Sequence, residues 1–253
     1  MKNIAVILAG GSGKRMGGQI PKQFLPLAGR SVLERSVSTF DLHPAIDEVA
    51  IVVHPEWRTE AEQCAARCQH KPTIIDGGAE RYMSSINAIM AFIDRPDDTN
   101  LLLHDAARPL LSAAVIDRVV AALQHSEAVG VAVPCNDTIW EVHPDIDGLT
   151  TSPSPGGKDL HGERGLSRFV ARTPERRLMW QAQTPQAFRL PLIRDAYQRA
   201  LQDPQFAATD DCSVVRRYMP GIKITVVEGE YSNFKLTCQD DLRRAETELQ
   251  HQR

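Results

Sequence analysis

The feature that most constrains the fold is an alternation of short apolar runs with segments of helical periodicity along the first half of the chain. The β-rich runs occupy residues 4–8, 49–53, 73–75 and 101–103, and the helical segments occupy residues 32–40, 56–68, 84–93 and 113–123. Strands that alternate with helices typically form a parallel sheet covered on both faces. The sequence therefore predicts an α/β fold with a mostly parallel, twisted sheet and helices on both faces.

The loops that follow these strands are expected to share one edge of the sheet, because crossovers between parallel strands are right-handed. Ligands of open α/β sheets bind at this edge, outside the carboxyl ends of the strands. LAGGSGKRMG follows the first strand, DGGAER follows the third, and HDAARP ends the fourth. A ligand site is therefore predicted where these three segments meet.

The second half of the chain has a different pattern. Strand-like segments at 128–134 and 137–142 lead into a stretch at about 143–167 that is rich in Gly, Pro, Ser and charge and lacks periodicity. This composition predicts a mobile insertion. Order is expected to resume near residue 168, with helices at 191–201 and 211–217, a strand at 222–227 and a closing helix at 240–250.

The composition narrows the class of protein. A chain of 253 residues with 42% hydrophobic residues is large enough to bury a substantial core. A formal net charge of −3 gives no general attraction to nucleic acid or to an anionic membrane, so neither is expected as a partner. The five cysteines lack the spacing of a zinc or redox motif, and the first apolar run passes directly into glycines without a signal-peptide cleavage site. We expect a cytoplasmic protein with reduced thiols.

The glycine-rich loop after the first strand is suited to binding an anion. Ala9, Gly10, Gly11 and Gly13 are closely spaced, so backbone N–H groups can turn towards a phosphate. The spacing excludes two familiar loops. A P-loop requires Ser or Thr after its Gly-Lys pair, where this chain has Arg15, and a dinucleotide fingerprint that starts at Gly11 requires a further glycine three residues after Gly13.

Charged residues near these loops suggest chemistry on a phosphate. Lys14, Arg15 and Lys22 follow the glycine-rich segment, and a solvated charged loop is the structural alternative for them. Asp105 ends the fourth strand at the same sheet edge, where a hard oxygen ligand can hold Mg²⁺, and Arg108 follows three residues later. A helix or turn cap is the structural alternative for Asp105.

Six motifs together resemble a known family. LAGGSGKRM…PKQFLPLAG, DGGAERYMSS, LLLHDAARPLL, VPCNDTIW, MWQAQTPQAF and NFKLTCQDDL are similar, in this order, to the 2-C-methyl-D-erythritol 4-phosphate cytidylyltransferase family. The resemblance covers nearly the whole chain. The stretch at about 143–167 is the main part that does not match.

The resemblance implies a nucleotide-diphospho-sugar-transferase-like fold in one cytidylyltransferase domain spanning residues 1–253. It implies a projecting β-arm for homodimerisation, which contains the flexible insertion, at about 138–176. The implied reaction is transfer of CMP from CTP to 2-C-methyl-D-erythritol 4-phosphate, which gives CDP-methylerythritol and pyrophosphate in non-mevalonate isoprenoid precursor biosynthesis. The implied cofactor is Mg²⁺, with CTP as co-substrate.

The resemblance also implies roles for individual residues. The catalytic cations would be Arg15 and Lys22. The residues that hold CTP would be Ala9, Gly10, Gly11, Gly13, Gly78, Ala79, Arg81 and Ser84. The residues that hold the acceptor would be Asp105, Arg108, Thr138, Arg176, Thr184 and Lys235, with Asp105 also the metal ligand. Arg176 would reach the partner's site across the dimer, and the neighbouring Arg172 and Arg177 are alternatives for that role.

Three other functions compete with this interpretation. The ribitol 5-phosphate cytidylyltransferases, which make CDP-ribitol, are a similar family with the same glycine-rich loop. The motif HDAARP favours the methylerythritol phosphate family over them. Trp140 argues against that choice, because a lysine is common at its position. An NAD-dependent oxidoreductase would require an acidic residue after the second strand, where this chain has His54 and Pro55. A non-catalytic nucleotide-binding regulator would lose the cations, whereas Arg15, Lys22 and Lys235 are present. His104 is interpreted as a packed structural residue.

Overall fold

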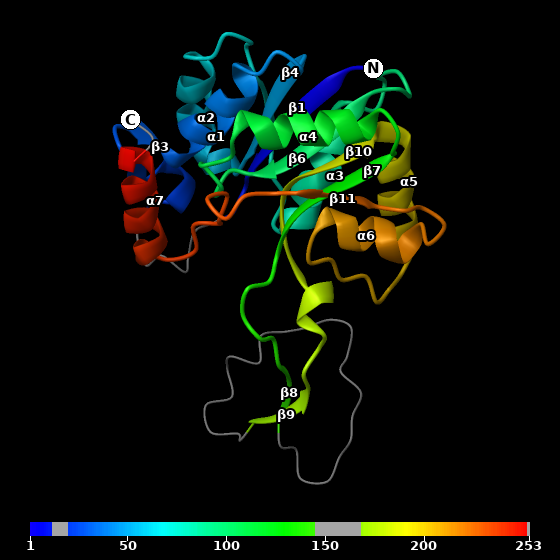
Figure 1. Ribbon diagram of the computed structural model, residues 1–253. Coiled ribbons are helices and arrows are strands. Elements are labelled where there is room, and N and C mark those ends of the chain that lie inside the picture. Colours follow the sequence, from blue (N-terminus) through cyan, green and yellow to red (C-terminus); the bar gives the residue numbers. More distant parts are fainter. Residues whose placement is uncertain (12–19, 145–167, 252–253) are drawn as a thin grey trace.

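The computed structural model describes residues 1–11, 20–144 and 168–251 (Figure 1). The strands of its main sheet are β1 (Asn3–Ala9), β4 (Glu48–Val53), β5 (Thr73–Asp76), β6 (Asn100–Asp105), β7 (Ala128–Pro134), β10 (Trp180–Arg189) and β11 (Thr225–Glu228). Within the described residues these strands form a seven-stranded sheet in the order β11-β7-β10-β6-β1-β4-β5. The four predicted strands of the first half are confirmed.

The sheet is mostly parallel, as predicted. β1 pairs in parallel with β4 and β6, β4 with β5, and β7 with β11. β10 is antiparallel to both β6 and β7. β10 was not predicted from the sequence, because polar side chains and Pro185 interrupt its apolar pattern. Its pairing with β7 is irregular between Gln183 and Gln186. The predicted strand at 222–227 begins later, at Thr225.

Helices cover both faces of the sheet. They are α1 (Val32–Asp41), α2 (Arg58–Ala65), α3 (Arg81–Ala91), α4 (Ala113–Leu123), α5 (Leu190–Ala200), α6 (Asp211–Tyr218) and α7 (Gln239–His251), and a 3-10 turn, Pro55–Trp57, precedes α2. Buried residues of α1, α2 and α4 form one core cluster, and those of α3, α5 and α6 form a second. No helix in the described ranges is long and apolar enough to cross a membrane.

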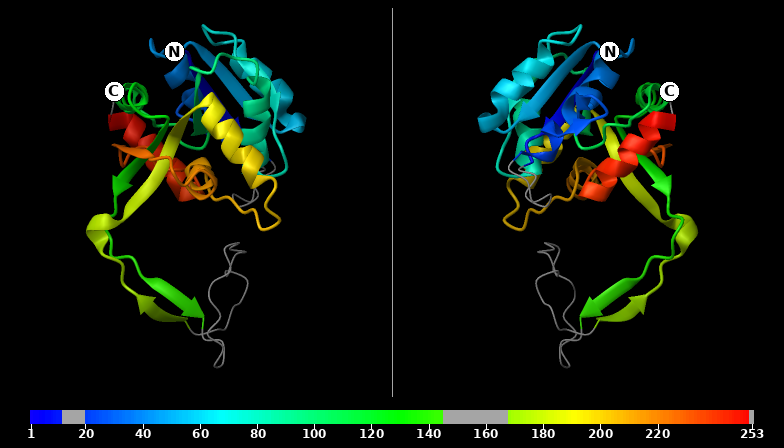
Figure 2. Two further views of the ribbon diagram at one scale, coloured as in Figure 1. Left: turned by 90° about the vertical axis from the view of Figure 1, so that its right-hand side faces the viewer. Right: turned by 90° about the vertical axis from the view of Figure 1, so that its left-hand side faces the viewer.

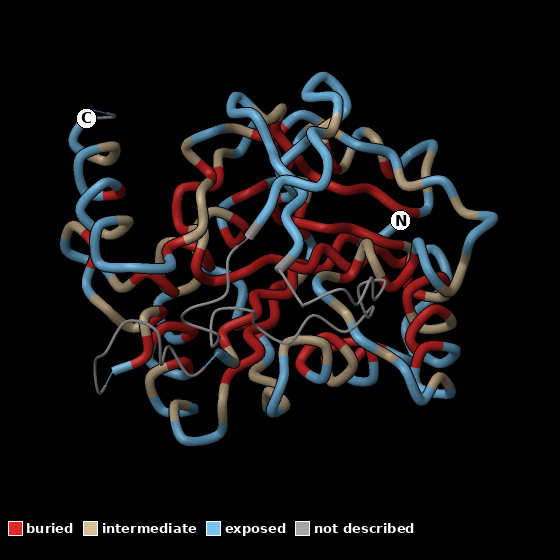
Figure 3. Tube along the Cα trace, turned by 90° about the horizontal axis from the view of Figure 1, so that it is seen from below, coloured by how far each residue is buried: buried red, intermediate tan, exposed pale blue. Residues whose placement is uncertain are grey.

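β1 shows why the chain forms this layered core. All of its residues are buried, and they alternate between the two clusters: Ala5 and Ile7 contact one helical layer, while Ile4 and Val6 contact the other. Such a continuous apolar run is typical of a strand covered on both faces. Figure 3 shows the buried positions concentrated in the central strands and the inner faces of the helices.

A hairpin projects from the main body (Figure 2). Its strands β8 (Glu141–Pro144) and β9 (Arg168–Arg172) pair antiparallel, and a 3-10 turn, Arg176–Leu178, leads back towards β10. We call the described residues 135–144 and 168–179 the arm. The prediction of a strand at 137–142 was wrong for its first four residues, since β8 begins at Glu141. The predicted insertion falls mostly on residues 145–167, outside the described residues.

The end of the chain packs beside the segment that follows the glycine-rich loop. A hairpin of β2 (Pro26–Leu27) and β3 (Arg30–Ser31) shares a small core with α7. Leu27, Leu236 and Ala245 are buried in this core. This packing brings the segment before α7, which contains Lys235, to the same sheet edge as the end of β1.

Candidate active site

A cavity of about 650 Å³ opens at the carboxyl ends of β1, β4 and β6 and at the start of α3. Pockets for small ligands commonly measure roughly 300–1,000 Å³. The lining comes from the predicted segments and from the segment before α7: Leu8, Ala9, Gly10, Gly11, Lys22, Gln23, His54, Gly78, Ala79, Glu80, Arg81, Ser84, Asp105, Ala106, Ala107, Thr209, Lys235 and Thr237. The three sequence segments therefore meet where the topology predicted.

The loops after β1 and β5 are in close contact through Ser84. A Cβ atom on Gly10 would lie 2.8 Å from Ser84 Oγ, so a larger residue at this position would displace the buried Ser84 side chain. Gly78 N donates a hydrogen bond to Ser84 Oγ (3.2 Å). Gln23 Nε2 donates to the carbonyl oxygens of Ala9 (2.7 Å) and Gly11 (2.9 Å) and thereby fixes the end of the β1 loop.

The start of α3 faces this cavity. Glu80 occupies the N-cap position of α3 without a side-chain capping hydrogen bond, and Gly78 and Ala79 precede it. The first N–H groups of a helix lack partners within the helix and attract anions. The cavity therefore combines a helix N-terminus with the backbone of a glycine-rich loop.

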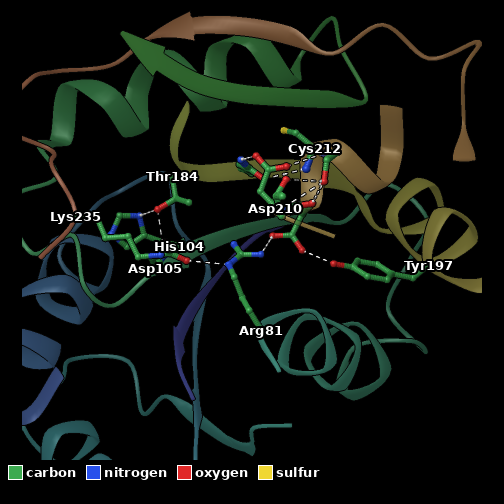
Figure 4. Close-up of polar contacts among 12 residues, drawn as sticks. Arg81, His104, Asp105, Thr184, Tyr197, Asp210, Cys212 and Lys235 are labelled. Atoms are coloured by element: carbon green, nitrogen blue, oxygen red, sulfur yellow. Dashed lines mark hydrogen bonds and ion pairs between the residues drawn. The ribbon is translucent and has the colours of Figure 1, made fainter. Parts of the chain in front are cut away.

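Asp105 lies at the centre of the charged part of the site (Figure 4). Its Oδ1 accepts a hydrogen bond from Arg81 Nε (3.1 Å), and its Oδ2 accepts one from Lys235 Nζ (2.7 Å). Arg81 Nη1 also donates to Asp211 Oδ2 (2.8 Å). Four charged groups that are far apart in the sequence thus form one network.

The network fixes the protonation states of Asp105 and Arg81. Burial alone would raise the pKa of Asp105, but the charges of Arg81 and Lys235 outweigh it and hold that pKa well below its usual value. Burial would likewise lower the pKa of Arg81, and the carboxylates of Asp211 and Asp105 outweigh it, so that this pKa is raised. Asp105 is therefore ionised and Arg81 is charged at neutral pH.

A chain of hydrogen bonds beneath the site orients the backbone of Asp105. Its N–H donates to Thr184 Oγ1 (3.0 Å), which lies 3.0 Å from His104 Nδ1. His104 Nε2 lies 3.1 Å from the carbonyl oxygen of Arg108, which can only accept, so Nε2 carries the proton and Nδ1 accepts from Thr184. Burial lowers the pKa of His104 to about 4, which keeps the ring neutral. The structural interpretation of His104 is confirmed.

Two other predicted cations lie at or near the cavity. Lys22 lines it and donates from Nζ to the carbonyl oxygen of Leu236 (2.7 Å). Arg108 lies outside the lining and donates to the carbonyl oxygens of Asn233 (2.8 Å) and Ala182 (3.2 Å). Arg108 thus ties the end of β6 to β10 and to the segment that carries Lys235.

Several predicted residues are not gathered at the cavity of this chain. Thr138 and Arg176 are exposed on the arm, and Arg176 Nη1 donates to the carbonyl oxygen of Asn136 (3.2 Å). Thr184 is buried behind Asp105. Gly13 and Arg15 lie outside the described residues, so the structure does not place them.

Among the described residues, six polar ones at the site were not predicted from the sequence, and Glu80 and Thr237 in the cavity lining are two of them. Gln23, His54 and Thr209 line the cavity, and Asp211 anchors Arg81 from behind it. Gln23 lies in the quoted motif PKQF, directly after Lys22, which is a signal that could have identified it. His54 directly follows β4 at the predicted sheet edge, which is a second usable signal, whereas Thr209 and Asp211 are distant in sequence from the predicted segments.

The described residues contain no group of three or more His, Cys, Asp or Glu side chains that could hold a metal ion by themselves. Mg²⁺, however, is commonly bound by one or two carboxylates together with substrate phosphates and water. Asp105 fits this type of binding, because it is ionised, faces the cavity and has two oxygens that can each accept more than one partner.

Comparison with known proteins agrees with the motifs. The profile of the family described as 2-C-methyl-D-erythritol 4-phosphate cytidylyltransferase matches residues 3–152 and 163–251. The unmatched residues 153–162 lie inside the predicted insertion. A 2-C-methyl-D-erythritol 4-phosphate cytidylyltransferase from Thermobifida fusca is 43% identical over 247 residues, which cover 97% of this chain and 92% of that protein.

Two further relatives are informative. A bifunctional ribulose 5-phosphate reductase/CDP-ribitol pyrophosphorylase from Haemophilus influenzae is 37% identical over 243 residues, which cover 95% of this chain but 47% of that protein. Among solved structures, a 4-diphosphocytidyl-2C-methyl-D-erythritol synthase from Anaerococcus prevotii superposes with a TM-score of 0.81 at 27% identity, over 98% of this chain and 96% of that one. The predicted fold class is confirmed.

Proposed function

Because this chain belongs to the 2-C-methyl-D-erythritol 4-phosphate cytidylyltransferase family, we propose that its cavity binds CTP and transfers CMP to the phosphate of 2-C-methyl-D-erythritol 4-phosphate, as part of isoprenoid precursor synthesis. The products are CDP-methylerythritol and pyrophosphate. The observation that carries the proposal is the convergence of the glycine-rich loop, the start of α3 and the Asp105 network on one cavity.

The chemistry is a displacement at phosphorus. An oxygen of the acceptor phosphate attacks the α-phosphorus of CTP, the new P–O bond forms, and the bond from the α-phosphorus to the bridging oxygen breaks to release pyrophosphate. A phosphate monoester is already largely dianionic at neutral pH, so the reaction requires no strong general base. The barrier is the approach of two anions and the charge that accumulates on the phosphorus.

The residues of the cavity suit this task. Gly10, Gly11 and the first turn of α3 offer backbone N–H groups to the triphosphate. Lys22 and Lys235 both line the cavity and supply positive charge there, and Arg15 is proposed to supply a further cation from the glycine-rich loop. Preorganised cations stabilise the transition state without a reorganisation cost.

Mg²⁺ is part of this proposal. Asp105 would hold the ion together with phosphate oxygens of CTP, and the ion would neutralise charge on the triphosphate. The low pKa of Asp105 supports the assignment, since a metal ligand has to be ionised. Lys235 and Arg81, which pair with Asp105 in the structure, would then be available to bind the anionic substrates.

The identity of the acceptor is tested by comparing two sugar-alcohol phosphates as substrates. The purified enzyme, CTP and Mg²⁺ are mixed with 2-C-methyl-D-erythritol 4-phosphate or with ribitol 5-phosphate, and pyrophosphate release is measured for each acceptor. We expect kcat/KM to be higher for the methylerythritol phosphate. A higher value for ribitol 5-phosphate would favour the activity named for the Haemophilus relative and would overturn the acceptor assignment.

We also propose that residues 1–253 act as one catalytic domain that dimerises through the arm. Trp140, Val142, Phe169 and Val170 are exposed on the arm, each more than 40% accessible. An isolated hairpin has little stability in water, and exposed apolar side chains on it favour contact with another surface. A second copy of the chain is the proposed occupant.

Arg176 is the proposed contribution of the arm to the partner's acceptor site. The two neighbouring candidates pair with carboxylates of the arm itself: Arg172 with Glu141 and Arg177 with Glu175. Arg176 donates to a backbone carbonyl oxygen instead, so its charge is not neutralised by that contact. Thr138 lies on the same arm and is proposed to contact the acceptor as well.

The unpaired thiols of the five cysteines are compatible with a cytoplasmic location.

A further inference from the structure

Arg81 is held by two carboxylates that differ in their surroundings (Figure 4). Asp105 Oδ1 accepts from Arg81 Nε, faces the cavity and is shared with Lys235. Asp211 Oδ2 accepts from Arg81 Nη1, but its side chain is fully buried and lies outside the cavity lining. Arg81 Nη2 is buried and has no hydrogen-bond partner among the described residues. Arg81 is therefore held by one carboxylate outside the cavity lining, that of Asp211, and its Nη2 donor is still available for a ligand.

Asp211 is itself rigidly fixed. It is the first residue of α6, and its Oδ1 accepts a hydrogen bond from the Tyr197 hydroxyl (2.6 Å). Gln186 of β10 binds the residues on either side of it, donating to Asp210 Oδ2 (2.7 Å) and accepting from Cys212 N (2.9 Å). These contacts tie Asp211 to the central sheet and to α5.

We propose that Asp211 is a positioning residue that holds the Arg81 guanidinium towards the triphosphate of CTP. An arginine side chain loses rotamer freedom when it binds an anion, and a fixed carboxylate behind it imposes that order in advance. When substrate and metal engage Asp105, the contact with Asp211 keeps Arg81 in place. This inference rests on the proposed function, because it assigns Arg81 to CTP.

The test is a double-mutant cycle with CTP as the varied substrate at a saturating acceptor concentration. We expect Asp211→Asn to raise the KM for CTP about tenfold, because it removes the charge that pairs with Arg81. We expect Tyr197→Phe to raise it about threefold, because it removes one hydrogen bond to that carboxylate and leaves the charge in place. We expect kcat to stay within about twofold, since Arg81 acts on the bound triphosphate in both ground and transition states. In an Arg81→Ala background, Asp211→Asn is expected to cause no further rise.

A matched control lies elsewhere on the surface. Asp203 Oδ2 accepts hydrogen bonds from Arg217 Nη2 (2.6 Å) and from the Tyr218 hydroxyl (2.7 Å), so the same three residue types meet in a more exposed position away from the cavity lining. Asp203→Asn and Tyr218→Phe are expected to leave the KM for CTP unchanged. The melting temperature of every variant is measured to separate stability from binding.

The outcomes are distinguishable. Normal CTP kinetics in folded Asp211→Asn and Tyr197→Phe variants would overturn the inference alone, as would an equal effect of Asp211→Asn with and without Arg81. If Asp211→Asn does not fold, Tyr197→Phe decides, because it removes one hydroxyl and keeps the ring. Failure of the wild-type enzyme to bind CTP in calorimetry would overturn the proposed function and this inference together.

Discussion

At the level of single residues, Lys22 is proposed to act in catalysis more than in CTP binding. The backbone of the glycine-rich loop and of α3 can bind a triphosphate without it, whereas charge on the reacting phosphorus needs a nearby cation. We expect Lys22→Ala, and equally Arg15→Ala, to lower kcat more than about a hundredfold, the usual consequence of removing one preorganised group. The KM for CTP is expected to rise only modestly. Steady-state kinetics check this, with the exposed Lys71→Ala as control; near-normal turnover in both variants would contradict it.

Because His104 is buried, the free energy of unfolding is expected to depend on pH. Burial lowers its pKa from 6.5 to about 4 in the folded protein, so between these values the unfolded chain binds the proton more tightly. The free energy of unfolding therefore falls as pH drops from 6.5 to 4, by up to about 3 kcal/mol from this residue. Denaturant unfolding over this pH range is expected to show a shallower dependence for His104→Gln than for the wild type.

The exposed His125 provides the comparison for this measurement. His125→Gln is expected to keep the wild-type pH dependence. The buried-histidine account would be contradicted if both variants gave the same profile.

Single residues were predictable from sequence only where a local pattern marked them. Asp105 is identified by its position at the end of an apolar strand, and Lys22 by its place after a glycine-rich loop. Asp211 carries no such signal. It lies 130 residues from Arg81, and an acidic pair before a helix has the ordinary interpretation of a cap, which Asp210 does fulfil. Only the packing of α6 beside α3 and α5 reveals its contact with Arg81.

At the scale of elements, the loop between β5 and α3 has little room to change. A Cβ atom on Gly78 would collide with the Cβ atom of Met83 in the first turn of α3, so the start of the helix would have to shift. We expect Gly78→Ala to raise the KM for CTP several-fold and to lower the free energy of unfolding by about 1–3 kcal/mol, as overpacking does.

Gly221 is the matched position for this experiment. A Cβ atom there meets nothing within 4 Å, so Gly221→Ala is expected to leave the kinetics unchanged. A wild-type KM for CTP in Gly78→Ala would show that the start of α3 does not shape the nucleotide site.

Helices and strands could be predicted from sequence periodicity where they are buried on both faces or on one face only. β1, β4 and α4 were predicted closely, because a strand buried on both faces and an amphipathic helix leave clear patterns. β10 was missed because its polar residues serve the site and its anchors: Gln183 and Gln186 bond to neighbouring segments instead of packing in an apolar core. These polar contacts interrupt the apolar pattern by which a strand is recognised.

At the scale of the whole molecule, the arm determines the expected assembly. If its exposed apolar side chains face a second copy, charging them should separate the subunits. We expect the wild type to sediment as a dimer and the double variant Trp140→Asp, Phe169→Asp to sediment as a monomer with a melting temperature close to that of the wild type. A monomeric wild type, or a double variant that remains dimeric, would contradict the proposed role of the arm.

The global organisation was partly predictable from sequence. The order of strands and helices predicted the sheet and the edge at which the motifs meet, because parallel crossovers have one handedness. The arm was expected from family resemblance alone, since an isolated hairpin with no core of its own has no strong periodicity. The insertion at about 143–167 lies mostly outside the described residues, and the family profile leaves only its central part, 153–162, unmatched.

The position of a radioactive label after turnover shows whether this cavity directs attack on the α-phosphorus of CTP. The enzyme is incubated with the methylerythritol phosphate acceptor, Mg²⁺ and CTP labelled with ³²P at either the α or the γ phosphate. We expect the α label to appear in CDP-methylerythritol and the γ label in pyrophosphate. Release of the α label as CMP, or transfer of the γ label to the acceptor, would contradict it.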